Sequence, residues 1–86
     1  MIKVFKYQLG VVDEQMVRIP IGAEFLHLAV QNKILCLWAK VDPSAEKTER
    51  LIFIHGTGHE MDPRARKHLG SFFLSGRDLV FHAFIN

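Results

Sequence analysis

Residues 25–42 read FLHLAVQNKILCLWAKVD, and they decide the fold class. Apolar side chains alternate along both halves of this stretch, which is typical of strands. Between the halves stands Asn32-Lys33, and asparagine tolerates the left-handed conformation that tight hairpin turns require. The pattern predicts antiparallel strands at 25–31 and 34–42, with one face of the hairpin in the core. The expected core face comprises Leu26, Leu28 and Val30, then Leu35, Leu37, Ala39 and Val41.

The same alternation continues on both sides of the hairpin and predicts an all-β protein. Further strands are expected near 2–9, 15–19, 49–55, 69–75 and 78–85, which makes about seven strands in all. Regular strands with short turns predict a small antiparallel β-sandwich or barrel, with at most one or two short helical turns. The whole chain, residues 1–86, is expected to form a single domain.

Turns and loops are predicted where proline and glycine interrupt the alternation. Pro20-Ile21-Gly22 and Ser75-Gly76-Arg77-Asp78 have the residues that turns prefer. The polar stretch 42–49 is expected to be an exposed loop. A second break runs from 56 to 68, where Asp62 as a cap and Pro63 as the next residue are compatible with a single helical turn.

Composition limits the classes of partner. Eleven Lys and Arg against nine Asp and Glu leave a net charge of +2, which argues against nucleic-acid binding. The single cysteine, Cys36, excludes an internal disulfide and indicates a reducing compartment. The alternating N-terminus reads as neither a signal peptide nor an anchor, and no apolar run is long enough to span a bilayer. We therefore expect a cytoplasmic protein that does not enter the membrane.

The most distinctive local motif is Gly56-Thr57-Gly58-His59, which directly follows an apolar strand. The glycines either allow a tight exit from the strand or expose backbone N–H groups to an anion. A basic segment follows the motif and suits an anionic ligand or an acidic partner, or is simply an exposed charged loop. The candidate binding residues are Gly56, Thr57, Gly58, His59, Arg64, Arg66 and Lys67. As exposed loop charges, Arg64 and Arg66 are expected to contribute little to stability.

The sequence predicts no catalytic residue, no metal site and no cofactor. Cys36 lies among apolar strand residues, as an inert core thiol does. The carboxylate pairs Asp13-Glu14 and Glu60/Asp62 are expected to be solvated, because aspartate is common in turns. A metal site would need His27, His55 and His82 to converge, whereas half-buried histidines that bond to the backbone are the commoner outcome.

Large aromatic residues suggest where a partner could bind. Trp38, Phe81 and Phe84 either pack on both faces of a sandwich or form an interface with another chain. The strand 78–85 is the last in the chain and apolar on both faces. We therefore expect it to be an edge strand that pairs with a second copy in a homodimer.

Four motifs occur together in this chain, in the order P-x-G-A, L-W-A, G-T-G-H and aromatic-H-x-F. They are Pro20-Ile21-Gly22-Ala23, Leu37-Trp38-Ala39, Gly56-Thr57-Gly58-His59 and Phe81-His82-Ala83-Phe84. With these motifs, the chain from near residue 3 to residue 85 resembles a family of small bacteriophage and prophage proteins of unknown function. The resemblance implies a phage origin but no activity, cofactor or catalytic residue. The segment with Arg64, Arg66 and Lys67 is more basic than expected of relatives.

Two functions follow as hypotheses. The first is a phage-encoded accessory protein that binds, and inhibits, a host macromolecule of antiviral defence in the infected bacterial cell. The second is a module that binds or sequesters a phosphate-bearing nucleotide with the glycine loop and the basic residues beside it. A metal-dependent hydrolase is disfavoured because a complete ligand set is missing from the sequence.

Overall fold

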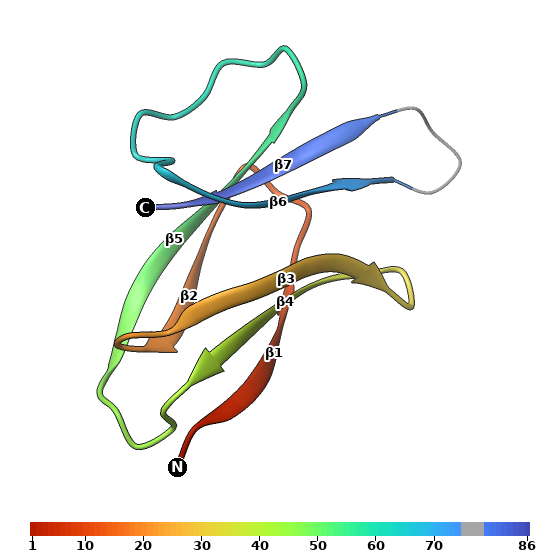
Figure 1. Cartoon of the computed structure of the whole chain (residues 1–86). Coiled ribbons are helices and arrows are strands. Elements are labelled where there is room, and N and C mark those ends of the chain that lie inside the picture. Colours follow the sequence, from red (N-terminus) through yellow and green to blue (C-terminus); the bar gives the residue numbers. More distant parts are fainter. Residues whose placement is uncertain (75–78) are drawn as a thin grey trace.

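The computed structural model describes residues 1–74 and 79–86, and these residues form seven strands (Figure 1). The strands are β1 (Lys3–Leu9), β2 (Glu14–Pro20), β3 (Glu24–Gln31), β4 (Ile34–Val41), β5 (Lys47–Gly56), β6 (Lys67–Phe73) and β7 (Val80–Ile85). The prediction of an all-β fold with seven strands is confirmed. The described residues contain no helix, and therefore none that could cross a membrane. The predicted turn at 75–78 lies outside the described residues.

The strands form two antiparallel sheets that face each other without closing into a barrel. Sheet A has the order β1-β4-β3, and sheet B has the order β2-β5-β7-β6. The long strand β5 pairs with β2 along its first part and with β7 along its last part. The prediction that the last strand is an edge is wrong, because β7 lies between β5 and β6. The long connection after β5 passes over the position next to β5 and leads to β6 at the edge of the sheet. Strand β7 then occupies the position between β5 and β6.

The core lies between the sheets. Sheet A supplies Leu9, Leu28, Leu35 and Leu37, and sheet B supplies Ile52, Ile54, Phe72, Ala83 and Ile85. The predicted core face of β4 is confirmed, since its four residues are buried. On β3, Leu28 is the only one of the three predicted core residues that is buried. A β-bulge between Phe25 and His27 shifts the register of this strand. Phe25 thereby packs against the core, while Leu26 is 49% exposed and Val30, near the end of the hairpin, is 44% exposed.

The predicted turns form through the expected backbone conformations. Asn32 and Lys33 have φ of 52° and 67°, as the primed hairpin turn requires. Gly22 has φ of 83°, and the Ala23 N–H donates to the Pro20 carbonyl at 3.2 Å. The loop after β4 is shorter than predicted, because β5 begins at Lys47 to pair with β2.

Strands β3 and β6 approach closely where the edges of the two sheets meet. A Cβ built on Gly70 would lie 3.0 Å from the Cβ of Leu28. Gly70 follows a β-bulge at His68–Gly70, which bends β6 toward sheet A. A residue with a side chain does not fit here without movement of Leu28.

Candidate functional site

The connection of residues 57–66, here called the covering loop, folds over the outer face of sheet B (Figure 1). Ile52 and Ile54 point into the core, so Phe53 and His55 point outward from the same strand. Phe53 is nevertheless only 1% exposed. The guanidinium carbon of Arg64 lies 5.0 Å from the centre of the Phe53 ring, so Arg64 covers this ring with a cation.

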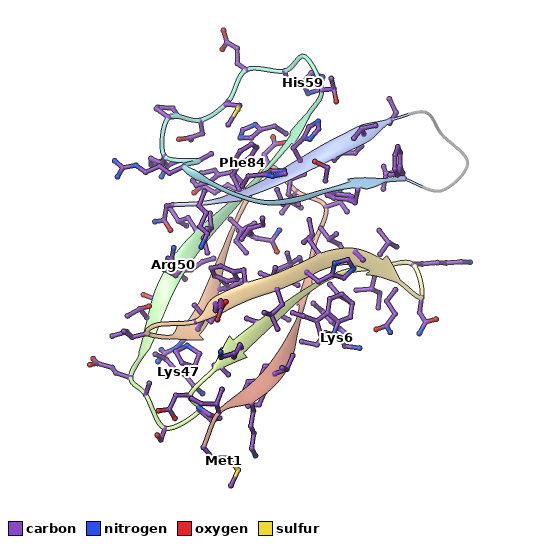
Figure 2. All side chains as sticks on the ribbon, viewed as in Figure 1. Met1, Lys6, Lys47, Arg50, His59 and Phe84 are labelled. Atoms are coloured by element: carbon purple, nitrogen blue, oxygen red, sulfur yellow. The ribbon has the colours of Figure 1, made fainter. Side chains whose placement is uncertain are left out.

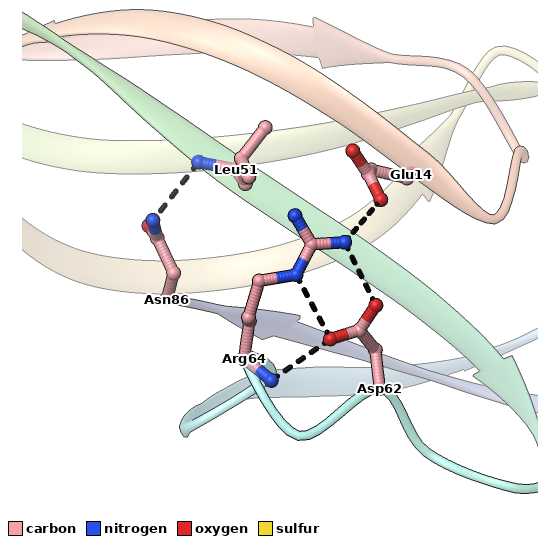
Figure 3. A network of polar contacts seen from close by, with 5 residues as sticks. All are labelled: Glu14, Leu51, Asp62, Arg64 and Asn86. Carbon is pink, nitrogen blue, oxygen red and sulfur yellow. Dashed lines mark hydrogen bonds and ion pairs between the residues drawn. The ribbon is translucent and has the colours of Figure 1, made fainter.

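Arg64 is held in place by two carboxylates (Figure 3). Its Nε and Nη2 donate to Oδ1 and Oδ2 of Asp62 at 3.0 and 2.8 Å. Its Nη2 also donates to Oε1 of Glu14 at 2.8 Å. The side-chain hydrogen bond from Arg64, together with one from the Arg64 backbone N–H, lowers the pKa of Asp62 to about 2. Arg64 therefore anchors the covering loop to β2, fifty residues away in sequence.

Of the other two basic candidates, Arg66 lies near Arg64 and Lys67 does not. The Lys67 ammonium lies 5.5 Å from the centre of the Phe25 ring, on the core side of sheet B. Arg66 is exposed, and with Arg64 and Asn86 it lines an open pocket of about 280 Å³. The three predicted charges therefore do not form one binding surface.

The G-T-G-H motif builds a tight turn at the end of β5. Gly58 has φ of 88°, and the His59 N–H donates to the Gly56 carbonyl at 3.1 Å. The His59 ring lies against Gly56, where a Cβ would come within 3.0 Å of it. The Thr57 N–H donates to the Val80 carbonyl at 3.2 Å. The N–H groups of Thr57 and His59 are thus already bonded within the protein.

Next to this turn, hydrogen bonds join four side chains into a continuous row on the outer face of sheet B, here called the polar chain. His68 Nε2 and Ser71 Oγ lie 3.2 Å apart, Ser71 Oγ and His82 Nδ1 lie 2.7 Å apart, and His82 Nε2 and Thr57 Oγ1 lie 2.8 Å apart. Thr57 donates its only hydroxyl hydrogen to the Val80 carbonyl, so it accepts from His82 Nε2. His82 Nδ1 is then the acceptor for the Ser71 hydroxyl, which assigns the tautomer of this ring.

This polar chain places a hydroxyl against an imidazole, as nucleophile and base are placed in many hydrolases. The ring of His82 is oriented by the Thr57 hydroxyl, and the chain ends at the carbonyl of Val80. No carboxylate joins it among residues 1–74 and 79–86. In this structure, the hydrogen bonds of the polar chain connect the G-T-G-H turn to β6 and β7.

The sequence did not lead us to expect His68 and Ser71 as members of the polar chain. In a regular strand, residues three apart point to opposite faces. The β-bulge at His68–Gly70 brings both side chains to the same face. Gly70 inside the strand was the available signal, since glycine inside a strand often marks a bulge.

A pocket of about 440 Å³ opens between the covering loop and the start of β2. It is lined by Asp13, Glu14, Phe53, Ile54, His55, His59, Glu60, Met61 and Asp62. The carboxylates expected to be solvated therefore gather here, and two of them bind Arg64. His55 Nε2 is buried and has no hydrogen-bond partner in the described part of the chain.

The histidines do not assemble a metal site within the described residues. His55 and His82 are cross-strand neighbours in sheet B, whereas His27 pairs with Trp38 in sheet A. His27 therefore does not converge with the other two histidines. In Figure 2, the labelled His59 and Phe84 lie at the same end of the molecule, on the covering loop and β7.

The three aromatic candidates lie on different faces. Trp38 is half-buried on the outer face of sheet A, with its ring 5.7 Å from that of His27. Phe81 packs toward the core and stacks on Phe72 at 5.7 Å. Phe84 lies on the outer face of sheet B, 5.1 Å from the His68 ring. They do not form one interface.

An apolar recess lies at the end of the sandwich that carries the β3–β4 turn. It has a volume of about 440 Å³ and is lined by Val11, Val30, Lys33, Leu35, Phe73 and Leu74. Phe73 is 68% exposed, and Val11 and Val30 are both more than 40% exposed. Large exposed apolar groups that surround a hollow are typical of an interaction site. Phe72 and Phe73 point to opposite faces of the strand, and the sequence pattern alone does not indicate which of the two is exposed.

The four motifs meet in pairs in the fold. Thr57 of G-T-G-H bonds to His82 of the F-H-A-F strand. Ala23 of the P-I-G-A turn packs on the small core cluster that contains Ala39 of L-W-A. Comparison with curated proteins and with solved structures finds no match. A family model does match, over residues 1–86, and the chain accordingly belongs to the family described as a domain of unknown function, DUF7352.

Proposed function

We propose that this protein acts by binding a protein partner through the apolar recess. The observation that carries the proposal is the exposure of Phe73, 68%, at the rim of a hollow of about 440 Å³. Interfaces between proteins bury apolar side chains of one partner in such pockets of the other. A hollow of this size accommodates an apolar side chain of the partner together with its neighbours.

A charged residue at the rim of the recess also favours a partner of opposite charge. Among the described residues of its lining, Lys33 is the only charged one, and it stands in the β3–β4 turn with a left-handed backbone. An acidic side chain beside the apolar anchor of the partner complements Lys33 and selects the orientation of binding. The partner segment therefore combines a large apolar residue with a nearby Asp or Glu.

The origin of the partner follows from the resemblance to phage and prophage proteins. The four motifs favour a phage-encoded protein that works in the cytoplasm of an infected bacterium. Its partner is then a host protein, such as a component of antiviral defence, and the phage-encoded protein inhibits this host protein by binding to it.

A small anionic ligand at the glycine loop is the second candidate. Its remaining support is the open pocket that Arg64 and Arg66 line with Asn86. Arg64 is already paired with two carboxylates, and the N–H groups of Thr57 and His59 are bonded internally. These contacts leave little donor capacity for a phosphate, so we rank the protein partner first.

The test is affinity capture from bacterial lysate with wild-type protein, Phe73→Asp and Met61→Asp. Met61 is 48% exposed and lies in the other pocket, so its variant is the matched control. We expect a host protein to be retained by wild type and Met61→Asp and lost by Phe73→Asp. Thermal unfolding of each variant verifies the fold.

Two outcomes contradict the proposal. One is a captured protein that Phe73→Asp retains as well as wild type does. The other is an eluate that contains a nucleotide, lost on Arg66→Glu, and no protein that depends on Phe73, which supports the second candidate. Small molecules are therefore analysed in the same eluates.

A further inference from the structure

We propose that the protein forms a homodimer in which β2 pairs with β2 of a second copy, joining the two B sheets. Strand β2 is an edge of sheet B, and among the described strands its one partner is β5 (Figure 1). The inference rests on the backbone and charges of β2, not on the apolar recess, and it goes beyond the proposed function. It replaces the pairing through the last strand, which β7 cannot make from the middle of sheet B.

The backbone of β2 has one free side. The Asp13 carbonyl accepts from Ile54 N–H at 3.1 Å, and the Ile21 N–H donates to Glu46 at 2.8 Å. Odd-numbered residues of β2 therefore direct their backbone groups toward β5, and even-numbered residues direct theirs away from the sheet. The free N–H and C=O groups belong to Glu14, Met16 and Arg18. Such a row of groups is a template for another strand.

The side chains of β2 select one register for a two-fold pair. When the axis passes through Met16, Glu14 of each copy lies opposite Arg18 of the partner subunit. Glu14, Met16 and Arg18 share the outer face of sheet B, because their cross-strand neighbours there include Phe53 and Leu51. Two opposite-charge pairs thus flank a Met16–Met16 contact, and Met16 is 57% exposed in the single chain.

Neighbouring registers are less favourable. A shift by one pairing step places Glu14 opposite Met16, or opposite Pro20, which has no N–H to donate. Proline also occupies an even-numbered position, where its missing N–H faces away from β5, as in edge strands generally. Only the register centred on Met16 uses both charges of each copy.

The dimer adds a residue to the acidic pocket. Glu14 lines that pocket and already binds Arg64 at 2.8 Å. In the dimer, the partner subunit's Arg18 reaches the same carboxylate from the other side. Each pocket then has a guanidinium from each copy at its edge.

The first test is a charge exchange measured by sedimentation velocity at micromolar concentration. We expect wild type to be dimeric, and Arg18→Glu and Glu14→Arg each to raise the dimer dissociation constant by at least about tenfold. An equimolar mixture of the two variants restores both opposite-charge pairs and should give a heterodimer. A monomeric wild type, or variants that dimerise as tightly as wild type, overturns the proposal.

The second test does not depend on the folding of charge variants. Residues that face each other in a hydrogen-bonded antiparallel pair have Cα atoms about 5.5 Å apart, which a disulfide spans. Met16→Cys should therefore form a disulfide-linked dimer under mild oxidation. Met61→Cys, with similar exposure, is the control. Equal rates of cross-linking in the two variants contradict pairing through β2.

Discussion

The two faces of sheet B are both covered, but by different means. On the inner face, Ile52, Ala83 and Ile85 are 0% exposed because sheet A lies against them. On the outer face, Phe53 is nearly as well buried, yet its cover is a loop in which Arg64 pairs with Asp62 and binds Glu14 of β2. Burial on the inner face follows from strand alternation, whereas burial on the outer face depends on one polar network. The inner face should therefore dominate stability, and the outer face should determine how the loop and its pocket are arranged.

The largest effect is expected from a truncation on the inner face. Ile52→Ala removes a fully buried side chain and should lower the free energy of unfolding by about 2–5 kcal/mol. Leu51→Ala, next to it and half-buried on the outer face, should cost clearly less. Urea unfolding of both variants measures the difference. Equal costs show that the outer face is as much a part of the core as the inner one.

The contact between the sheets gives the next largest effect. Gly70→Ala places a Cβ 3.0 Å from Leu28 Cβ and should destabilise the protein by about 1–3 kcal/mol. In a Leu28→Ala background the contacts with Cδ2 and Cγ of Leu28, at 3.3 and 3.7 Å, are gone and only the contact with Cβ remains, so Gly70→Ala should cost less there. A double-mutant cycle in urea measures this coupling. Additive effects of the two substitutions contradict a close approach of β3 and β6.

The outer face is tested by charge reversal of the two arginines of the covering loop, one at a time. Arg64→Glu removes the cover of Phe53 and places a third carboxylate beside Asp62 and Glu14, so it should lower the melting temperature. Arg66→Glu is the matched control and should stay within about ±0.5 kcal/mol of wild type. Treating both residues as exposed loop charges predicts no effect for either. Equal melting temperatures of the two variants support that simpler view of the loop.

What the sequence predicted well depends on local patterns. Alternation located all seven strands, and Asn32-Lys33 located a hairpin turn, because both signals lie within a few residues. The partner of Arg64 was not predictable, since Glu14 is far away in sequence and nothing local marks the pair. The bulge that unites His68 and Ser71 lies where β6 approaches Leu28 of sheet A, a contact between residues far apart in sequence. Tertiary contacts therefore decided the candidate site, and local chemistry decided the strands.

The smallest expected effect is a dependence of stability on pH through Asp62. Its pKa falls from an ordinary value near 3.8 to about 2 in the folded protein, chiefly through the hydrogen bond from the Arg64 side chain. A depressed pKa means that the carboxylate stabilises the fold above about pH 4, and that this contribution is lost as the pH falls toward about 2. The stability difference between wild type and Asp62→Asn should therefore shrink between pH 5 and pH 2.

Urea unfolding across this pH range measures the difference, and Arg64→Ala provides the control. Without the guanidinium, Asp62→Asn should cost little at any pH, because the charge that stabilises the carboxylate is gone. Added salt should also reduce the effect, since the pair is partly open to solvent, with the side chain of Arg64 53% exposed. A difference that stays constant from pH 5 to pH 2 contradicts the ion pair as the fastener of the covering loop. The cover of Phe53 then depends on the packing of the loop alone, and the two faces of sheet B differ less than their chemistry indicates.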